Sequence, residues 1–187
     1  MIPQPNLKTL RLILRPFSIA DADPVAELLN DKVMTRNLRD VPWPYSLKDA
    51  QQWIGRLSGD WESGDAAVFA VCLLQQAESP RLVGAIGLVF EQPSNRAELG
   101  YWVGRDDWGQ GIATEACVSV LDFAFSELGI QRVYGECLAR NPASAAVLKK
   151  VGMSQEGVLA NHFRKDETDE YCDVQVFGLL RSDWNDR

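Results

Sequence analysis

The stretch that decides the fold is Glu98–Thr114, E-L-G-Y-W-V-G-R-D-D-W-G-Q-G-I-A-T, in which the sequence pattern changes its period. The first half alternates with a two-residue period and is rich in aromatic and branched side chains, which is typical of a β-strand. From Ala113 to Leu128 the apolar residues recur every three or four positions, which predicts an amphipathic helix. A strand therefore leads through a short turn directly into a long helix.

Two glycines, Gly109 and Gly111, lie in the turn between this strand and this helix. Glycine permits main-chain conformations, and a close approach to a ligand, that a side chain would prevent. The first N–H groups of a helix have no partner within the helix, and the helix dipole makes that end positive. The turn is therefore a candidate phosphate site, and the local pattern is equally compatible with glycines that serve the turn alone.

Composition places the chain among ordinary globular proteins. Its 187 residues, 46% of them hydrophobic, suit a single domain over residues 1–187 with a substantial core. The formal net charge of -7 argues against a general nucleic-acid binder, because phosphate contacts need a basic face, and weakly favours cationic substrates. The N-terminus lacks a signal pattern, and no apolar run is long enough for a membrane span, so we expect a cytoplasmic protein.

The cysteines and the histidine exclude several kinds of site. Cys72, Cys117, Cys137 and Cys172 are far apart and lie in apolar patterns, so we predict buried free thiols, which suit a reducing compartment. With His162 as the single histidine, a zinc site or a histidine-based triad is not expected, and we predict no metal.

The remaining chain alternates strands and helices without a repeat or a linker. Serine followed three residues later by aspartate, as in Ser18–Asp21 and Ser46–Asp49, predicts two helix starts, and Gly64 predicts a helix end. The predicted strands cover residues 7–16, 66–75, 81–91, 97–104, 131–139, 153–163 and 170–180, and the predicted helices begin at Ser18, Ser46, Ala113 and Asn141.

This order of elements indicates an α+β domain around one mixed sheet. The three strands over 66–104 are predicted to form an antiparallel meander, and strand 131–139 is predicted to run parallel to the strand before it, because a helix connects them. Segment 36–45 is too rich in proline for regular structure, and its Trp43 and Tyr45 either line a pocket or cover the core.

Two general phosphate-binding motifs fit the glycine turn poorly. A Walker A loop is excluded, since Gly111 is not followed by Lys-Ser or Lys-Thr. A dinucleotide fingerprint is closer, because Gly109-x-Gly111 opens a helix and Glu136 lies in the next strand. However, Thr114 occupies the third glycine position, and the turn follows a meander.

Five motifs point to a third phosphate ligand: L-x-T-x-R-L-x-L-R-P near the N-terminus, E-L-G-Y-W-V, W-G-Q-G-I-A-T-E-A, N-P-A-S-A-A-V-L-K-K-V-G-M, and the closing Asp183–Trp184. With them the chain resembles the GNAT superfamily of N-acetyltransferases, most closely the branch of bacterial ribosomal-protein-alanine N-acetyltransferases. The resemblance implies a mostly antiparallel sheet of about seven strands, splayed between the fourth and fifth and flanked by about four helices. It also implies acetyl-CoA as donor and a primary amine as acceptor, on a peptide or protein N-terminus or a small amine, and is compatible with a homodimer.

The resemblance also implies which residues hold acetyl-CoA. Trp108 stands where the family usually has arginine or glutamine. Trp102 and Val103 are expected beside the pantetheine arm, with the N–H of Val103 polarising the thioester carbonyl. Asn141 is expected to bond the pantetheine amide or to cap its helix. The diphosphate is assigned to the main-chain N–H groups of Gly109, Gln110, Gly111, Ile112, Ala113 and Thr114.

Candidates for the chemistry follow from the same resemblance. Glu98 is the candidate base, acting directly or through a water. Ser144 or a water is the candidate acid, because Leu148 stands where many members of the superfamily carry a proton-donating tyrosine. Trp43, Tyr45 and Tyr101 are candidates for the acceptor side, although such aromatic residues are equally suited to a core.

The sequence supports two further expectations and leaves two alternative functions open. His162 is expected on the surface or packed rather than in the acceptor pocket, and Asp173 is expected to be a structural hydrogen-bond acceptor. The missing tyrosine leaves room for a noncatalytic module that senses acyl-CoA, and a dinucleotide enzyme is a weaker alternative.

Overall fold

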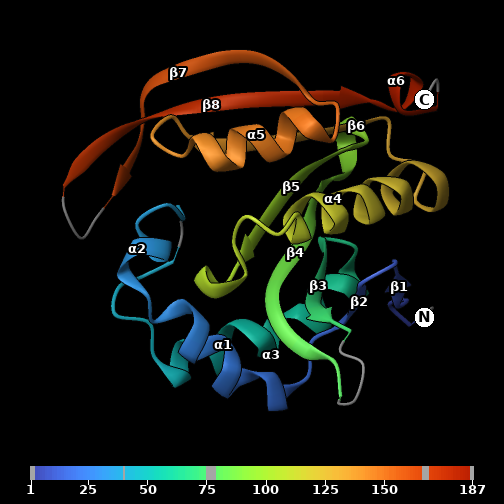
Figure 1. Ribbon diagram of the computed structural model, residues 1–187. Helices are drawn as coiled ribbons and strands as arrows, with labels where there is room; N and C mark the ends of the chain where they lie inside the picture. Colours follow the sequence, from blue (N-terminus) through green and yellow to red (C-terminus); the bar gives the residue numbers. More distant parts are fainter. Residues whose placement is uncertain (1–2, 40, 75–78, 166–168, 186–187) are drawn as a thin grey trace.

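The computed structural model describes residues 3–39, 41–74, 79–165 and 169–185 (Figure 1). Within them the chain forms one eight-stranded sheet in the order β1-β2-β3-β4-β5-β6-β8-β7. The strands are β1 (Leu7–Lys8), β2 (Leu12–Pro16), β3 (Ala66–Leu73), β4 (Arg81–Glu91), β5 (Arg96–Val103), β6 (Arg132–Leu138), β7 (Ser154–Lys165) and β8 (Glu170–Leu180). The helices are α1 (Ala22–Leu29), α2 (Lys32–Thr35), α3 (Leu47–Ser63), α4 (Ile112–Asp122), α5 (Pro142–Lys150) and α6 (Arg181–Asn185).

The mixed α/β fold and the meander β3-β4-β5 are confirmed. The residues predicted to begin and end helices do so. Ser46 accepts a hydrogen bond from the N–H of Asp49, and Gly64 ends α3 with φ of 76°. Asp21 accepts a bond from the N–H of Ser18 at 2.8 Å. The turns between β3 and β4 and between β7 and β8 lie partly outside the described residues.

One predicted strand was wrong in its length, and two short helices were not predicted. The strand predicted over 7–16 is two strands, β1 and β2, because Thr9 and Leu12 bond to each other across a turn. Helix α2 was missed because its four residues are too few to show a period. Helix α6 was also missed; its Trp184 donates to Asp122 at 2.9 Å. The described residues therefore hold eight strands and six α-helices, rather than about seven and four.

The sheet separates two hydrophobic clusters, with α4 and α5 on one face and α1, α2 and α3 on the other (Figure 1). Strand β3 serves both clusters. Phe69 and Val71 belong to the cluster under α4, whereas Ala70 and Cys72 face α1 and α3. A strand that is buried on both faces has a nearly continuous apolar sequence, as β3 does. All four cysteines are buried free thiols, as predicted.

Strands β5 and β6 start as a parallel pair and then separate. Residues Arg96–Glu98 pair with Arg132–Tyr134, and the pairing stops there. Beyond that point β5 stays paired with β4 as far as Val103, and β6 stays paired with β8 as far as Leu138. The predicted splay is confirmed, and it opens a gap inside the sheet.

Strands β7 and β8 form a long hairpin beside α5 (Figure 1). Its register shifts between Leu159 and Phe163, where Asn161 has φ of 49° and donates its N–H to the carboxylate of Asp173 at 2.8 Å. The structural role predicted for Asp173 is therefore confirmed. Within the described residues, none of the helices combines the length and the apolar content needed to cross a membrane.

Candidate active site

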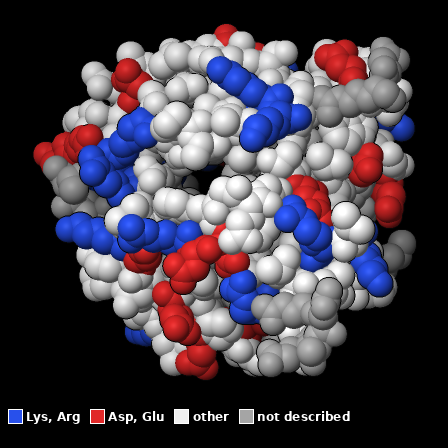
Figure 2. Space-filling view, viewed as in Figure 1, with Lys and Arg blue, Asp and Glu red and all other residues white. Residues whose placement is uncertain are grey.

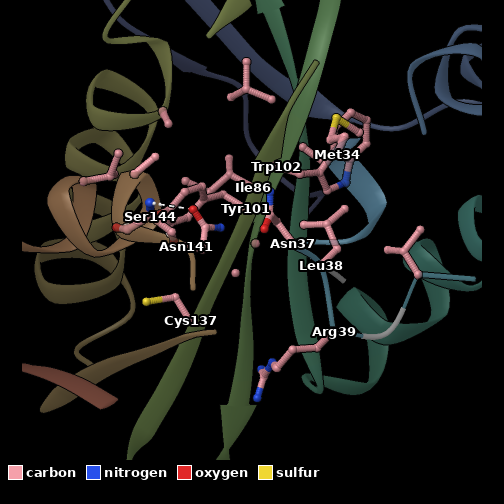
Figure 3. A pocket seen from close by; sticks show the side chains of 18 of the residues that line it. Met34, Asn37, Leu38, Arg39, Ile86, Tyr101, Trp102, Cys137, Asn141 and Ser144 are labelled. Carbon is pink, nitrogen blue, oxygen red and sulfur yellow. Dashed lines mark hydrogen bonds between the residues drawn. The ribbon is translucent and has the colours of Figure 1, made fainter. Parts of the chain in front are cut away.

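A cavity of 1280 Å³ lies at the gap between β5 and β6, and both strands contribute to its lining. On one side its walls come from residues 107–114 and α5, and on the other from α2, the segment after it and α3. Figure 2 shows a hollow near the centre of this face, with mainly uncharged residues around it. Figure 3 shows the lining side chains converging on the strands from both sides.

The glycine turn presents main-chain donors to this cavity. Gly109 and Gly111 have φ of 74° and 78°, a region that favours glycine, and Gly111 directly precedes α4. The first helical bond runs from the N–H of Glu115 to the carbonyl of Gly111 at 3.0 Å. Within the described part of the chain, the N–H groups of residues 109–114 donate to no acceptor. They form a group of free donors at a helix start, which suits a phosphate.

Side chains from the β1–β2 turn brace the glycine turn. Arg11 donates to the carbonyl of Gln110 at 3.0 Å and to the carboxylate of Glu115 at 2.7 Å. Thr9 also donates to Glu115, at 2.6 Å. Burial raises the pKa of Glu115, but the bonds from Thr9 and Arg11 outweigh it and hold that pKa below its ordinary value of 4.5. The turn is thus fixed by a charged network as well as by its own glycines.

The end of β5 directs one N–H group into the gap. The N–H of Gly104 donates to the carbonyl of Val83 on the β4 side at 2.8 Å. Successive N–H groups of a strand point to opposite sides, so the N–H of Val103 points away from β4, toward the gap. The carbonyl of Val103 accepts a bond of 2.6 Å from the indole N–H of Trp108, which ties the glycine turn to β5.

Tyr101 and Ser144 form a hydroxyl pair at the wall made by α5. The two hydroxyl oxygens are 2.9 Å apart, and the Tyr101 hydroxyl also lies 3.1 Å from the carbonyl of Ser144. Burial raises the pKa of Tyr101, which keeps the phenol protonated. Asn141 caps α5 by accepting from the N–H of Ser144 at 3.2 Å. Leu148 is buried in the core cluster and is not part of the cavity lining.

An ion-pair network lies where β5 and β6 begin to separate. Arg39, from the segment after α2, donates to the carboxylate of Glu98 on β5 and to that of Glu136 on β6. The hydroxyl of Tyr134 lies 3.5 Å from the second oxygen of Glu98 and 2.7 Å from Glu91. One guanidinium group therefore bridges the two diverging strands.

Comparison with known proteins decides the family. Residues 11–154 match the sequence profile of a protein family that is described as "Acetyltransferase (GNAT) domain". The chain belongs to the GNAT family of acetyltransferases. It is 29% identical over 182 residues to the uncharacterized N-acetyltransferase p20 of Bacillus licheniformis, covering 96% of this chain and 98% of that protein. It is 30% identical over 146 residues to the ribosomal-protein-serine acetyltransferase of Escherichia coli strain K12, covering 76% and 78%.

Solved GNAT structures share the fold. The ribosomal L7/L12 alpha-N-protein acetyltransferase, solved in complex with coenzyme A, has a TM-score of 0.84 at 19% identity, covering 94% of this chain and 98% of that one. These relatives agree with the predicted ribosomal-protein branch.

The dinucleotide alternative is excluded, because the sheet is mostly antiparallel and the glycine turn follows a meander rather than opening a doubly wound unit.

The GNAT cavity brings most of the predicted site residues together. Tyr45 is buried and lines it, and burial raises the pKa of Tyr45 to about 12. The Trp102 side chain packs beside Met34 on the face of the sheet that α1, α2 and α3 cover (Figure 3), opposite the face that α4 and α5 cover. Among the described residues that line the cavity, Trp43 and His162 do not appear, and His162 is exposed.

Most of the predicted diphosphate-binding residues also line the cavity: Trp108, Gly109, Gly111, Ile112, Ala113 and Thr114. Gln110 is not among the lining residues, and its side chain donates to the carbonyl of Asp106.

The sequence analysis did not identify Arg39, and it considered Glu136 only as the acidic residue of a dinucleotide fingerprint. No local pattern marks Arg39, since it lies in an irregular segment and its partners are 59 and 97 residues away. The signal available for Glu136 was its place on a predicted strand next to the predicted splay. Lys165 was missed as well; it is buried and donates to the carbonyls of Thr35 and Leu38, both at 2.9 Å.

Proposed function

We propose that this GNAT protein transfers the acetyl group directly from acetyl-CoA to a primary amine, with both substrates bound at once. The acceptor is the N-terminus of a peptide or protein, or a small amine. The observation that carries the proposal is the cavity at the splay, which is lined from both faces of the sheet. Donor and acceptor can enter from opposite faces and meet between the strands.

The donor side fits acetyl-CoA. The free N–H groups of residues 109–114 would hold the diphosphate, where the start of α4 adds positive potential. The pantetheine arm would lie along the unpaired edge of β5, which ends at Val103. Asn141 uses its Oδ1 atom to cap α5, so its NH2 group would contact the pantetheine amide.

Main-chain geometry supports an oxyanion role for Val103. Its N–H points into the gap and would donate to the thioester carbonyl as negative charge develops there. A fixed donor of this kind contributes roughly 100-fold in rate. Fixing both substrates in one cavity contributes more, because alignment converts a bimolecular step into a unimolecular one.

Proton transfer is assigned to two separate groups. Glu98 would accept the proton of the amine, directly or through a water, since it lies on β5 where the strands begin to separate. Ser144 would donate toward the leaving thiolate, and the Tyr101 hydroxyl, 2.9 Å away, would orient the hydroxyl of Ser144. The buried position of Leu148 supports this assignment, because residue 148 is outside the cavity lining.

Calorimetry and an acceptor screen test the proposal. Acetyl-CoA should bind with a Kd in the micromolar range. A screen of peptide N-termini, polyamines, amino acids and aminoglycosides, followed by thiol release, should identify one class of acceptor. Initial rates should give intersecting lines, as expected for a ternary complex; parallel lines would contradict direct transfer. Tight binding without turnover for every acceptor would instead favour a noncatalytic sensor of acyl-CoA.

A further inference from the structure

The guanidinium group of Arg39 already occupies a cation position inside the acceptor side of the cavity. It lies between the carboxylates of Glu98 and Glu136, which come from the two separating strands. All three side chains line the cavity and are partly accessible, with exposed fractions of 27%, 25% and 15%. Figure 3 shows Arg39 extending from the segment after α2 toward the strands.

We propose that the ammonium group of the acceptor takes this position by displacing Arg39, so that the chain carries its own competitor for the acceptor site. The inference rests on the proposed function for the identity of the acceptor side. It adds Glu136 to Glu98 as an acceptor-binding residue and makes Arg39 a residue that sets acceptor affinity.

Charge balance favours such an exchange. Two carboxylates and one guanidinium leave a net charge of about -1, so the position holds a cation. Removing Arg39 without replacement would leave two carboxylates facing each other in a half-buried site, which is costly. An incoming ammonium replaces one cation by another, so that neither carboxylate is left unpaired.

Hydrogen bonds hold the main chain that precedes Arg39, so the exchange requires a rotation of the Arg39 side chain. The buried Lys165 donates to the carbonyl of Leu38 at 2.9 Å. Arg140 donates to the carbonyl of Arg36 at 2.8 Å. The displaced Arg39 side chain, already about a quarter exposed, can then move toward solvent.

Competition within the chain lowers the apparent affinity for an acceptor, since only the fraction of molecules with Arg39 displaced can bind it. Arg39→Ala should therefore lower the KM for the acceptor by about 5-fold and leave the KM for acetyl-CoA unchanged. Glu136→Gln should raise the KM for the acceptor, because one of its two partners is lost. A purely structural role of Arg39 predicts the opposite sign for Arg39→Ala.

The first experiment measures thermal stability and needs no turnover. The probes are ethylguanidinium and butylammonium chloride at about 50 mM, compared with sodium chloride of equal ionic strength. Each probe should raise the Tm of Arg39→Ala by about 1–2 °C more than that of the unmodified protein. Adding Glu136→Gln to Arg39→Ala should abolish the rise.

The second experiment measures competition in the acetylation assay, with the acceptor found by the screen. Ethylguanidinium should inhibit Arg39→Ala competitively with respect to the acceptor and should inhibit the unmodified protein more weakly, because there it must first displace Arg39. Arg96→Ala is the matched control. It also frees a carboxylate, that of Glu91, but outside the cavity lining, so we expect no competition.

Two kinds of result would overturn the inference. Equal Tm shifts for the two proteins would mean that Arg39 does not block a cation position. Noncompetitive inhibition, or a rate restored to Arg39→Ala by ethylguanidinium, would mean that Arg39 is a structural link between β5 and β6. A screen without any acetylated acceptor would refute the proposed function, while the Tm shifts would still decide whether Arg39 occupies a cation position.

Discussion

The two sides of the cavity are built in different ways. The side that we propose for the donor consists mostly of main-chain groups and caps from short stretches of sequence, residues 109–114 and 141–144. The side that we propose for the acceptor consists of side chains from three separate segments, with Arg39, Glu98 and Glu136 meeting across the splay. One side is local in sequence, and the other exists only after the sheet has formed.

The two proposed sides should respond differently to substitution. Main-chain N–H groups are present whatever the side chains are, so Trp108 can replace the usual arginine or glutamine without removing the donors of residues 109–114. On the proposed acceptor side a substitution removes the contact itself, because each contact there is made by a side chain. We therefore expect substitutions on the donor side to act through main-chain geometry, and those on the acceptor side through charge.

The largest effect is expected on the donor side. In Gly111→Val a branched side chain is forced into φ of 78°, and its Cβ atom would lie 3.5 Å from the guanidinium group of Arg11, which braces the turn. We expect acetyl-CoA to bind at least about 100-fold more weakly in calorimetry. Gly55→Ala is the control, because a Cβ atom there meets nothing within 4 Å and φ is ordinary. Unchanged affinity of Gly111→Val would show that the diphosphate is held elsewhere.

The second-largest effect is expected from Glu98, whose substitution should change catalysis without changing the binding of acetyl-CoA. Glu98→Gln should lower kcat by about 100-fold, because the amine loses its base, while the Kd of acetyl-CoA stays the same. Glu91→Gln is the matched control, since Glu91 also contacts Tyr134 but is outside the cavity lining. If both variants lose the same activity, the effect comes from the charged network as a whole.

A smaller effect is expected at the wall between the two sides. Tyr101→Phe removes the hydroxyl that orients Ser144, so kcat should fall by about 10-fold with little change in either KM. A double-mutant cycle with Ser144→Ala measures the coupling, and the double variant should be no slower than Ser144→Ala. Additive losses would mean that the two hydroxyl groups act independently.

The smallest effect concerns the bracing of the donor side. Glu115→Gln should lower the Tm at pH 7 by about 2 °C. Because the pKa of Glu115 in the folded protein is below its ordinary value of 4.5, its stabilising effect is complete above pH 4.5. That effect is lost as the pH falls through the folded-state value, so the Tm of the unmodified protein should approach that of the variant. A Tm difference independent of pH would contradict this role.

The fold was predictable wherever a pattern was long or a cap was specific. The amphipathic helix from Ala113, the caps Ser46 and Gly64, and the meander all follow from local physical preferences. The prediction failed for α2, which is too short to show a period, and for residues 7–16, where Thr9 makes a turn that the alternation does not reveal.

By itself the sequence determined the strand, the glycine turn, the helix start and, through its motifs, the family and its donor. Local patterns suffice there because they encode burial and main-chain conformation, which depend on neighbouring residues. The tertiary structure alone decided that Arg39 bridges Glu98 and Glu136 and that Tyr101 contacts Ser144. These contacts join residues 43 to 97 positions apart, and they depend on the strand register and on the point at which the β5–β6 pairing stops.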